Sequence, residues 1–150
     1  MNIFITVGTT PFDRLVRAAD MQLGADYKLT FQISEGKYIP KGHDYFRFSD
    51  DIDSYFKRAD LIISHGGAGT IYKALGLGKR LLVVPNLDRV DHHQLDICNY
   101  MVENNYACSC LEFDKLSETL KEACTHKFAS YQADTFTGIS NIRQFLGLQE

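Results

Sequence analysis

The sequence lacks any apolar run near the roughly 20 residues that a membrane-spanning helix requires. Met1 and Asn2 lead directly into the strand-like run 3–7, which leaves no room for a signal peptide, so we expect a soluble cytoplasmic protein. The formal net charge is -3, so the basic surface that a nucleic-acid partner requires is not expected. Repeats and low-complexity segments are also missing. With 150 residues, the chain suits one domain with a full core, which we assign to residues 1–150.

Paired cysteines of the metal-binding kind are missing as well. The four cysteines are Cys98, Cys108, Cys110 and Cys124. None of them has C-x-x-C spacing, and without an export signal we expect them to be reduced and structural. Cys108 and Cys110 lie two positions apart in a strand-like stretch, so they are expected to share a face. The neighbouring His92 and His93 would point to different sides of a helix, so no metal site is predicted.

Apolar runs alternate with helix-like segments along the chain. Strands are expected over 3–7, 27–33, 45–48, 61–63, 80–85 and 106–111. Helices are expected from Pro11 to Gly24, after a Ser49 or Asp50 cap, from Thr70, from an Asp91 cap to Asn104-Asn105, after an Asp114 cap, and over 139–146. Most strands are continuous apolar runs, as parallel strands covered on both faces should be. The alternation predicts an α/β fold with an open, doubly wound, Rossmann-like parallel sheet.

The segment 60–73 carries the clearest chemical signal, and it reads DLIISHGGAGTIYK. An apolar run ends at Ser64-His65, a glycine cluster follows, and a helix begins at Thr70. The first N–H groups of a helix have no partner inside it, and the helix dipole places partial positive charge there. Glycines let a phosphate approach this backbone closely. A tight strand-to-helix turn that binds nothing would show the same glycines.

A second glycine-bearing turn, Gly8-Thr9-Thr10, follows the first strand. In open α/β sheets, ligands bind beyond the carboxyl ends of the strands, where the strand order reverses. With the order 3-2-1-4-5-6, that place lies between the first and fourth strands. Both glycine turns would then face one crevice, which predicts a phosphate-bearing ligand.

Two common nucleotide motifs do not fit the sequence. The dinucleotide fingerprint G-x-G-x-x-G fails because Tyr72 stands where its third glycine should be, and because the turn follows the fourth strand. Gly36-Lys37 and Gly78-Lys79 lack the remainder of a P-loop. NAD and ATP are therefore weaker candidates for the ligand.

Four motifs, in order along residues 1–105, closely resemble one family. They are Val7-Gly-Thr-Thr-x-Phe-Asp-x-Leu15, Ser64-His-Gly-Gly-Ala-Gly-Thr70, Val84-Pro-Asn86 and Asp91-His-His-Gln94. The family is the nucleotide-sugar-binding, family 28-like C-terminal half of GT-B glycosyltransferases, which includes the peptidoglycan lipid-intermediate GlcNAc transferase. Within it, the chain looks most like the small soluble donor-binding subunits of two-part UDP-sugar transferases. Examples are the subunit for dolichol-linked GlcNAc transfer and its bacterial exopolysaccharide counterparts.

The resemblance implies a UDP-sugar donor, no cofactor and no catalytic metal, because a helix N-terminus stabilises the leaving UDP. The diphosphate would lie on 66–70, uracil near 48–52, and the ribose and sugar near 91–94. The expected donor-binding residues are Gly8, Thr9, Thr10, Ser49, His65, Gly66, Gly67, Ala68, Gly69, Thr70, Lys73, Asn86, His93 and Gln94. His65 is the one candidate catalytic residue, although it could equally hydrogen-bond the neighbouring loop.

Three side chains have competing interpretations. Gln94 could contact a sugar hydroxyl, or it could reach back to its own helix start from the capping-box position after Asp91. Asp13 is expected to serve the first turn of its own helix. Lys73 stands where related sequences usually carry the Glu or Asp that holds the ribose hydroxyls, and a lysine cannot accept those hydrogen bonds. Lys73 either reaches the diphosphate as a cation or marks a weakened or changed donor site.

The resemblance therefore implies a hexosyltransferase subunit that moves a sugar, such as GlcNAc from UDP-GlcNAc, to a polyprenyl-pyrophosphate-linked acceptor in surface polysaccharide or glycolipid synthesis. One Rossmann-like half needs a second half. We expect the latter to be a membrane-associated, acceptor-binding partner chain that recruits this subunit to the inner face of the membrane. One alternative is a non-catalytic regulatory or assembly subunit with a weakened nucleotide site. Another is an enzyme that uses a different nucleotide ligand.

Overall fold

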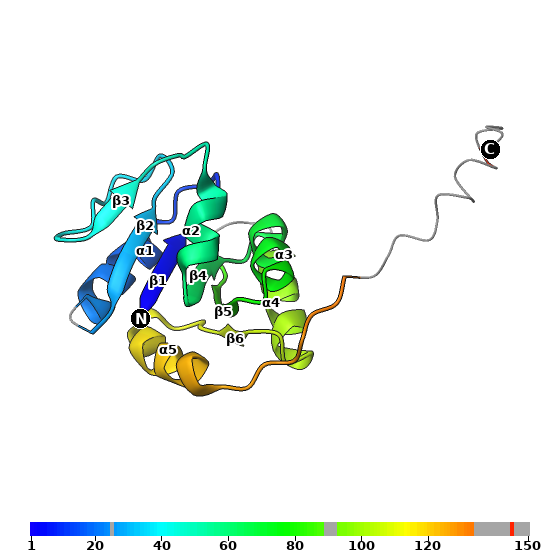
Figure 1. The fold of residues 1–150 in the computed structure, drawn as a ribbon. Coiled ribbons are helices and arrows are strands. Elements are labelled where there is room, and N and C mark those ends of the chain that lie inside the picture. Colours follow the sequence, from blue (N-terminus) through cyan, green and yellow to red (C-terminus); the bar gives the residue numbers. More distant parts are fainter. Residues whose placement is uncertain (25, 89–92, 134–144, 146–150) are drawn as a thin grey trace.

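The computed structural model describes residues 1–24, 26–88, 93–133 and 145. Within them, six parallel strands form one sheet in the order β3-β2-β1-β4-β5-β6 (Figure 1). The strands are β1 (Asn2–Thr6), β2 (Lys28–Gln32), β3 (Asp44–Phe46), β4 (Leu61–His65), β5 (Arg80–Val84) and β6 (Cys108–Ser109). The helices are α1 (Asp13–Leu23), α2 (Ile52–Arg58), α3 (Ala68–Gly76), α4 (His93–Glu103) and α5 (Leu116–Thr125), with a 3-10 turn at Phe113–Lys115. The predicted doubly wound sheet and its strand order are confirmed.

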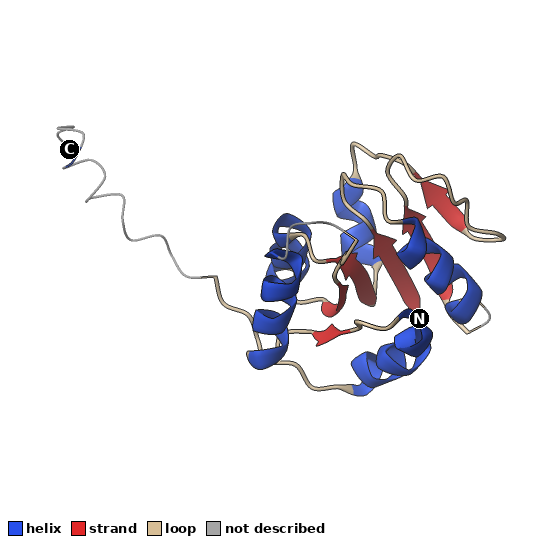
Figure 2. Ribbon diagram, turned by 180° about the vertical axis from the view of Figure 1, so that it is seen from behind, coloured by secondary structure: helices blue, strands red, loops and turns tan. Residues whose placement is uncertain are grey.

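Helices lie on both faces of the sheet (Figure 2). A cluster of buried apolar side chains fills the space between helices and sheet on each face. Alternate side chains of β1 point to opposite faces, so Ile3 and Ile5 pack with α1 and α5, whereas Phe4 packs with α2, α3 and α4. In β4, the run 61–63 is fully buried. Full burial of an aliphatic side chain contributes roughly 1.5–3 kcal/mol. The continuous apolar run of the central strand therefore follows from cover on both faces.

The helices begin at other residues than the capping patterns predicted. The first helix starts at Asp13, not at Pro11, and Phe12 is its N-cap residue. The Phe12 side chain is buried, and the Phe12 carbonyl accepts the first hydrogen bonds of the helix. Packing of this ring therefore fixes the point at which α1 begins. The helix that follows the glycine cluster starts at Ala68, two residues before the predicted Thr70. One cluster glycine, Gly69, thus lies inside the first turn of α3.

Two predicted side-chain caps are wrong. Ser49 or Asp50 was expected to cap the second helix, but α2 follows Asp51, and the Ser49 Oγ accepts a hydrogen bond from the Asp51 N–H at 3.2 Å. Asp114 was expected to cap the fifth helix, but it lies within the 3-10 turn, and α5 begins after Lys115. In both places the predicted cap residue lies in a local turn that precedes the helix.

The edge strands are shorter than the apolar runs suggested. For β6, the predicted stretch 106–111 reduces to Cys108–Ser109. The N–H groups of Tyr106 and Ala107 donate instead to the Met101 carbonyl at the end of α4, at 2.8 and 3.3 Å, so they cannot pair with β5. Cys108 and Cys110 are buried on one face as free thiols, as predicted. The Asp91 cap and the helix over 139–146, apart from position 145, lie outside the described residues.

Beyond α5, the chain returns beneath the sheet toward α4 (Figure 1). Residues 126–133 form this return segment, which the sequence did not place. The Tyr131 ring centroid lies 5.6 Å from that of Tyr72 on α3 and 5.4 Å from that of Tyr106. The return segment is thereby packed against the same helix that opens with the glycine cluster. Among the described residues, no helix is long and apolar enough to cross a bilayer.

Candidate functional site

A pocket of about 260 Å³ lies at the carboxyl edge of the sheet, where the strand order reverses between β1 and β4. Its walls are the turn after β1, the first turns of α3, and the segment from Phe48 to the start of α2. It is lined by Thr6, Gly8, Thr9, Gln32, Phe48, Ser49, Ile52, Phe56, Gly69, Thr70 and Lys73. The predicted convergence of the two glycine turns on one crevice is therefore confirmed.

A larger hollow of about 450 Å³ lies at the other edge of the sheet. It is lined by the amino ends of β1 and β2, including Asn2 and Lys28, and by the end of α2. Neither glycine turn reaches it, and ligands of parallel α/β sheets bind at the carboxyl edge. The smaller pocket is therefore the better candidate site.

The imidazole of His65 lies between the two glycine turns. Gly8 has a left-handed backbone with a φ of 65°, and a Cβ placed on it would stand 2.6 Å from the His65 Cε1. A Cβ on Gly67 would stand only 2.1 Å from the His65 Nε2. Both positions need glycine because the ring packs directly on their backbones. The His65 ring thus lies against both turns, and its hydrogen bond to the loop and its contact with the donor both stay predictions.

The first turn of α3 contributes Gly69 and Thr70 to the lining of the pocket. Its N-cap residue, Gly67, has an extended backbone and no side chain, and no side-chain cap bond is found for this helix within the described residues. Ala68 and Gly69 are exposed, and Thr70 is half-buried. Uncapped N–H groups together with the helix dipole favour an anion at this point.

A second group of predicted residues lies beside this turn, at the ends of β4 and β5. A Cβ on Gly66 would stand 2.7 Å from the Gln94 Cβ, so α4 packs tightly on the glycine cluster. The Gln94 Oε1 accepts a hydrogen bond from the Asn86 N–H at 2.9 Å. Gln94 thus holds the loop after β5, a role that neither of its two interpretations included. His93, the first residue of α4, is exposed.

Lys73 lies at the rim of the pocket and is held by a neighbouring helix. Its ammonium forms an ion pair with the Asp53 carboxylate in the first turn of α2, and it lies 5.1 Å from the centre of the Phe56 ring. The hydrogen bond from Lys73 lowers the pKa of Asp53 below its ordinary value. The ion pair brings a cation and a carboxylate to one edge of the pocket.

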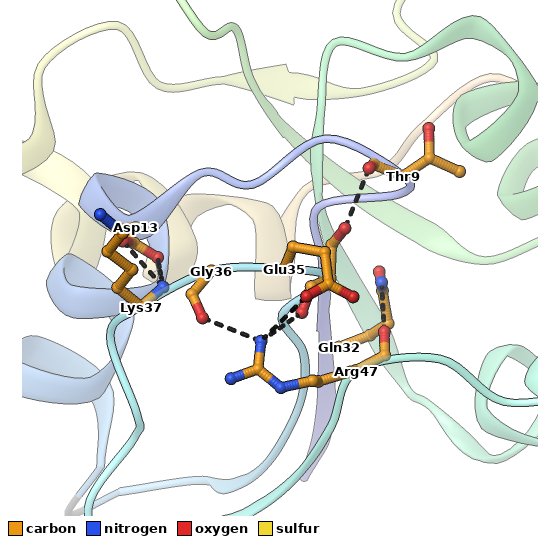
Figure 3. Close-up of polar contacts among 8 residues, drawn as sticks. Thr9, Asp13, Gln32, Glu35, Gly36, Lys37 and Arg47 are labelled. Atoms are coloured by element: carbon orange, nitrogen blue, oxygen red, sulfur yellow. Dashed lines mark hydrogen bonds and ion pairs between the residues drawn. The ribbon is translucent and has the colours of Figure 1, made fainter.

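Two contacts around the turn after β1 were missing from the sequence-based site. Gln32 lines the pocket and bonds this turn, and Arg47 fastens the segment behind it (Figure 3). The available signal was that the apolar residues of β1 and β2 give way to polar ones, Thr6 and Gln32, at the carboxyl ends of the two strands, where they are register partners. Asp13, expected to serve its own helix, also accepts hydrogen bonds from the Lys37 N–H at 3.0 and 3.1 Å. Among the described residues, no three His, Cys, Asp or Glu side chains are arranged to hold a metal ion.

The sheet order and the covering helices define a Rossmann-like α/β domain of the kind found in GT-B glycosyltransferases. The chain belongs to the glycosyltransferase family 28 C-terminal domain family, which matches its residues 2–144. The resemblance noted from the four motifs is therefore confirmed.

Several curated relatives are similar to this chain. It is 32% identical over 125 residues to "UDP-N-acetylglucosamine transferase subunit ALG13" of Homo sapiens, a match that covers 72% of this chain and 11% of the relative. The ALG13 subunit of Yarrowia lipolytica is 29% identical over 130 residues, which is 71% of this chain and 66% of the relative. The UDP-N-acetylglucosamine--N-acetylmuramyl-(pentapeptide) pyrophosphoryl-undecaprenol N-acetylglucosamine transferase of Streptococcus pneumoniae is 27% identical over 137 residues, covering 85% and 38%. The chain thus spans about a tenth of the length of the human relative.

Solved structures show the same fold. The solution structure of ALG13 superposes with a TM-score of 0.63 at 23% identity and covers 94% of both chains. The kitacinnamycin glycotransferase superposes with a TM-score of 0.66 at 19% identity and covers 83% of this chain and 35% of the other. At these identities the likeness concerns the arrangement of the backbone.

Proposed function

We propose that this chain is the donor-binding subunit of a two-component glycosyltransferase. It would take part in moving a sugar from a UDP-sugar to a polyprenyl-pyrophosphate-linked acceptor in surface polysaccharide or glycolipid synthesis. The observation that carries the proposal is the single pocket that joins the Gly8–Thr10 turn to the uncapped start of α3. Membership of the family supports it, as do relatives that are named subunits of a UDP-N-acetylglucosamine transferase.

The pocket offers a distinct surface to each part of a UDP-sugar. Backbone N–H groups at Gly69 and Thr70, with the Thr70 hydroxyl, would hold the diphosphate. Phe48 and Ile52 offer apolar surface for the uracil ring. As the sugar leaves, charge grows on the UDP, and the start of α3 would stabilise it without a metal ion. The sugar would extend toward His65 and Gln94.

The other half of the enzyme would be a separate chain. A GT-B enzyme closes two Rossmann-like halves over its substrates, and the described residues of this chain form one such sheet. We propose a membrane-associated partner that supplies the acceptor site and brings this subunit to the inner face of the membrane. Purified alone, the chain should then show little or no transfer. Robust turnover by this chain without a partner would refute the divided arrangement.

Calorimetric titration with UDP-GlcNAc, UDP, ADP and NAD tests the donor site. We expect binding of the two uridine ligands in the micromolar to millimolar range and a matching rise in melting temperature, because a ligand stabilises the fold by RT ln(1 + [L]/Kd). Gly69→Ala serves as the matched variant, since a Cβ there meets no atom within 4 Å and only a ligand would feel it. Equal binding of ADP or NAD, or no binding of either uridine ligand, would contradict the proposal.

One observation favours a second candidate function. Position 73 carries a lysine in place of a carboxylate. The carboxylate of Asp53 lies nearby, but it is paired with the Lys73 ammonium. A non-catalytic assembly subunit with a weakened nucleotide site would show this. Such a subunit would bind its partner chain in the absence of any uridine ligand and would remain indifferent to UDP-GlcNAc in the assembled complex.

A further inference from the structure

The side-chain amide of Gln32 is buried at the carboxyl end of β2 and uses both of its polar atoms. Its Oε1 accepts hydrogen bonds from the Thr6 hydroxyl at 2.6 Å and from the Gly8 N–H at 3.0 Å. Its Nε2 donates to the Gly8 carbonyl at 2.7 Å. The same Nε2 donates to the Arg47 carbonyl at 2.9 Å (Figure 3). Only 2% of Gln32 is exposed. One amide thus joins the ends of β1, β2 and the segment after β3.

Gly8 is the residue that this amide controls most closely. Its N–H and its carbonyl are both bonded to Gln32, while its backbone is held in the left-handed region. Two hydrogen bonds, one to the peptide group on each side of the Gly8 Cα, fix the direction in which the turn leaves β1. Because the His65 ring packs on Gly8 and also on Gly67, a shift of Gly8 would be transmitted to the N-cap of α3.

A second set of bonds supports the same turn from behind. The Ser34 hydroxyl donates to the Thr9 carbonyl at 2.9 Å. The Arg47 Nη1 donates in turn to the carbonyls of Ser34 and Gly36, at 2.9 and 3.0 Å (Figure 3). The segment 32–36 is therefore a rigid backing for the Gly8–Thr10 turn, and Gln32 is its contact with the pocket.

We propose that Gln32 is a positioning residue for the nucleotide-sugar site: its amide sets the orientation of the Gly8–Thr10 turn and thereby the affinity for the donor. The inference rests on the proposed function. Gln32 acts through the turn rather than on the donor, because its donor and acceptor capacity is taken up inside the protein. No sequence motif of the site includes it.

Gln32→Glu is the informative substitution, because the side chain keeps its shape and its two acceptor bonds. At pH 8 the carboxylate has no proton for the carbonyls of Gly8 and Arg47 and repels both, whereas the protonated acid at pH 5 can donate to one of them. We expect UDP-GlcNAc affinity to fall about tenfold or more at pH 8 and to return to within about threefold of wild type at pH 5. The donor's diphosphate diester has no proton to lose near pH 6.

Each variant is compared with wild type at the same pH, because His65 and Arg47 lie beside the same turn and Glu35 and Asp13 lie behind it. Thr30→Val is the matched control, since it lies on β2 two residues from Gln32 and should leave affinity unchanged at both pH values. A purely structural role would lower the melting temperature without a pH-dependent affinity in the folded protein. Titrations are therefore made well below each variant's melting temperature.

If Gln32→Glu fails to fold, Thr6→Val and Thr6→Ser take its place. Valine removes the hydroxyl that donates to the Gln32 Oε1, and serine retains it. We expect weaker UDP-GlcNAc binding for valine and rescue for serine. Wild-type affinity in Gln32→Glu at pH 8, an equal loss at both pH values, or equal affinities for the two Thr6 variants would overturn the inference. A wild-type chain that binds no uridine ligand would instead overturn the proposed function.

Discussion

The Lys73 ammonium on α3 is paired with the Asp53 carboxylate on α2, at the rim of the pocket that joins the two glycine turns. The two residues lie 20 positions apart in the chain, on the helices that precede and follow β4, and both helices cover the same face of the sheet. The pair gives the Lys73 ammonium a carboxylate partner on the neighbouring helix. It also means that the charge at the rim depends on both residues.

Substitutions of this pair should move donor affinity in opposite directions. Asp53→Asn removes a negative charge beside the pocket and releases the ammonium, so we expect UDP-GlcNAc to bind about two- to fivefold more tightly at low salt. Lys73→Met leaves Asp53 unopposed and should weaken binding by a similar factor. Calorimetry at two salt concentrations measures both, and Glu112→Gln, in the exposed Glu112–Lys115 pair, is the control. Tighter binding by Lys73→Glu would show that Lys73 does not act as a cation toward the diphosphate.

The glycines of the cluster should separate into two classes. Gly67→Ala would drive its Cβ into the His65 ring, so we expect a lower melting temperature and the loss of donor binding. Gly69→Ala has open space and lies in the first turn of α3, where alanine favours the helix by up to about 1 kcal/mol. Its melting temperature should hold or rise while UDP-GlcNAc affinity falls at least about tenfold. Gly76→Ala is the control, because a Cβ there also meets no atom within 4 Å, and it should change only stability. Unchanged UDP-GlcNAc affinity in Gly69→Ala would argue against a phosphate at the first turn of α3.

Gln94 has two separable duties. Its carbonyl oxygen holds the Asn86 N–H, and in the proposed site its amide would donate to the transferred sugar. Gln94→Glu keeps an acceptor for Asn86 but has no amide to donate, so we expect weaker binding of UDP-GlcNAc with unchanged binding of UDP. Gln94→Ala should weaken both, because the loop after β5 also loses its support. If Gln94→Glu binds both ligands like wild type, Gln94 is a loop support alone.

The buried thiols should be unreactive at neutral pH. Burial raises the pKa of Cys98 to about 12 and that of Cys108 to about 11, and it also raises the pKa of Cys110. Because the thiolate is the reactive form, we expect a thiol reagent to modify the half-buried Cys124 first in the native protein and all four cysteines in denaturant. Rapid native labelling of Cys98 would contradict this burial.

The same thiols give stability a defined pH dependence. The folded-state pKa values of Cys98 and Cys108 lie above the ordinary value of 9.0, so these thiols lose their protons more readily in the unfolded chain. Their contribution to the free energy of unfolding is therefore fully present below about pH 9 and declines as pH rises toward 11 to 12. Urea unfolding at pH 7 and pH 10 should show a lower free energy of unfolding at pH 10. Cys98→Ala should show a smaller difference between the two pH values.

The fold could be predicted from the sequence because its signals are local. The buried run 61–63 and the glycine cluster after it mark a central strand and a helix start without any knowledge of their neighbours. Strand order followed from the general rule for doubly wound sheets. The lengths of β3 and β6 did not, because an edge strand pairs only as far as its single neighbour allows.

The candidate site was predictable only where it consists of motifs. Gly8 and Gly69 can be recognised as turn residues from the sequence. The role of Gln32 depends on its register opposite Thr6, which exists only in the folded sheet. The Lys73–Asp53 pair likewise requires α2 and α3 to stand side by side. Contacts between separate elements are therefore what sequence reasoning missed.

The junction of β1 with β4 is a seam that divides the sheet into two blocks, and the packing of α1 on α5 joins the same blocks. Residues up to β3 build one block, β4 to β6 build the other, and β1 and β4 meet at the seam. The pocket lies across this seam: Gly8 and Thr9 line it from one block, and Gly69 and Thr70 line it from the other. A bound donor would contact both blocks and so stabilise the junction between them.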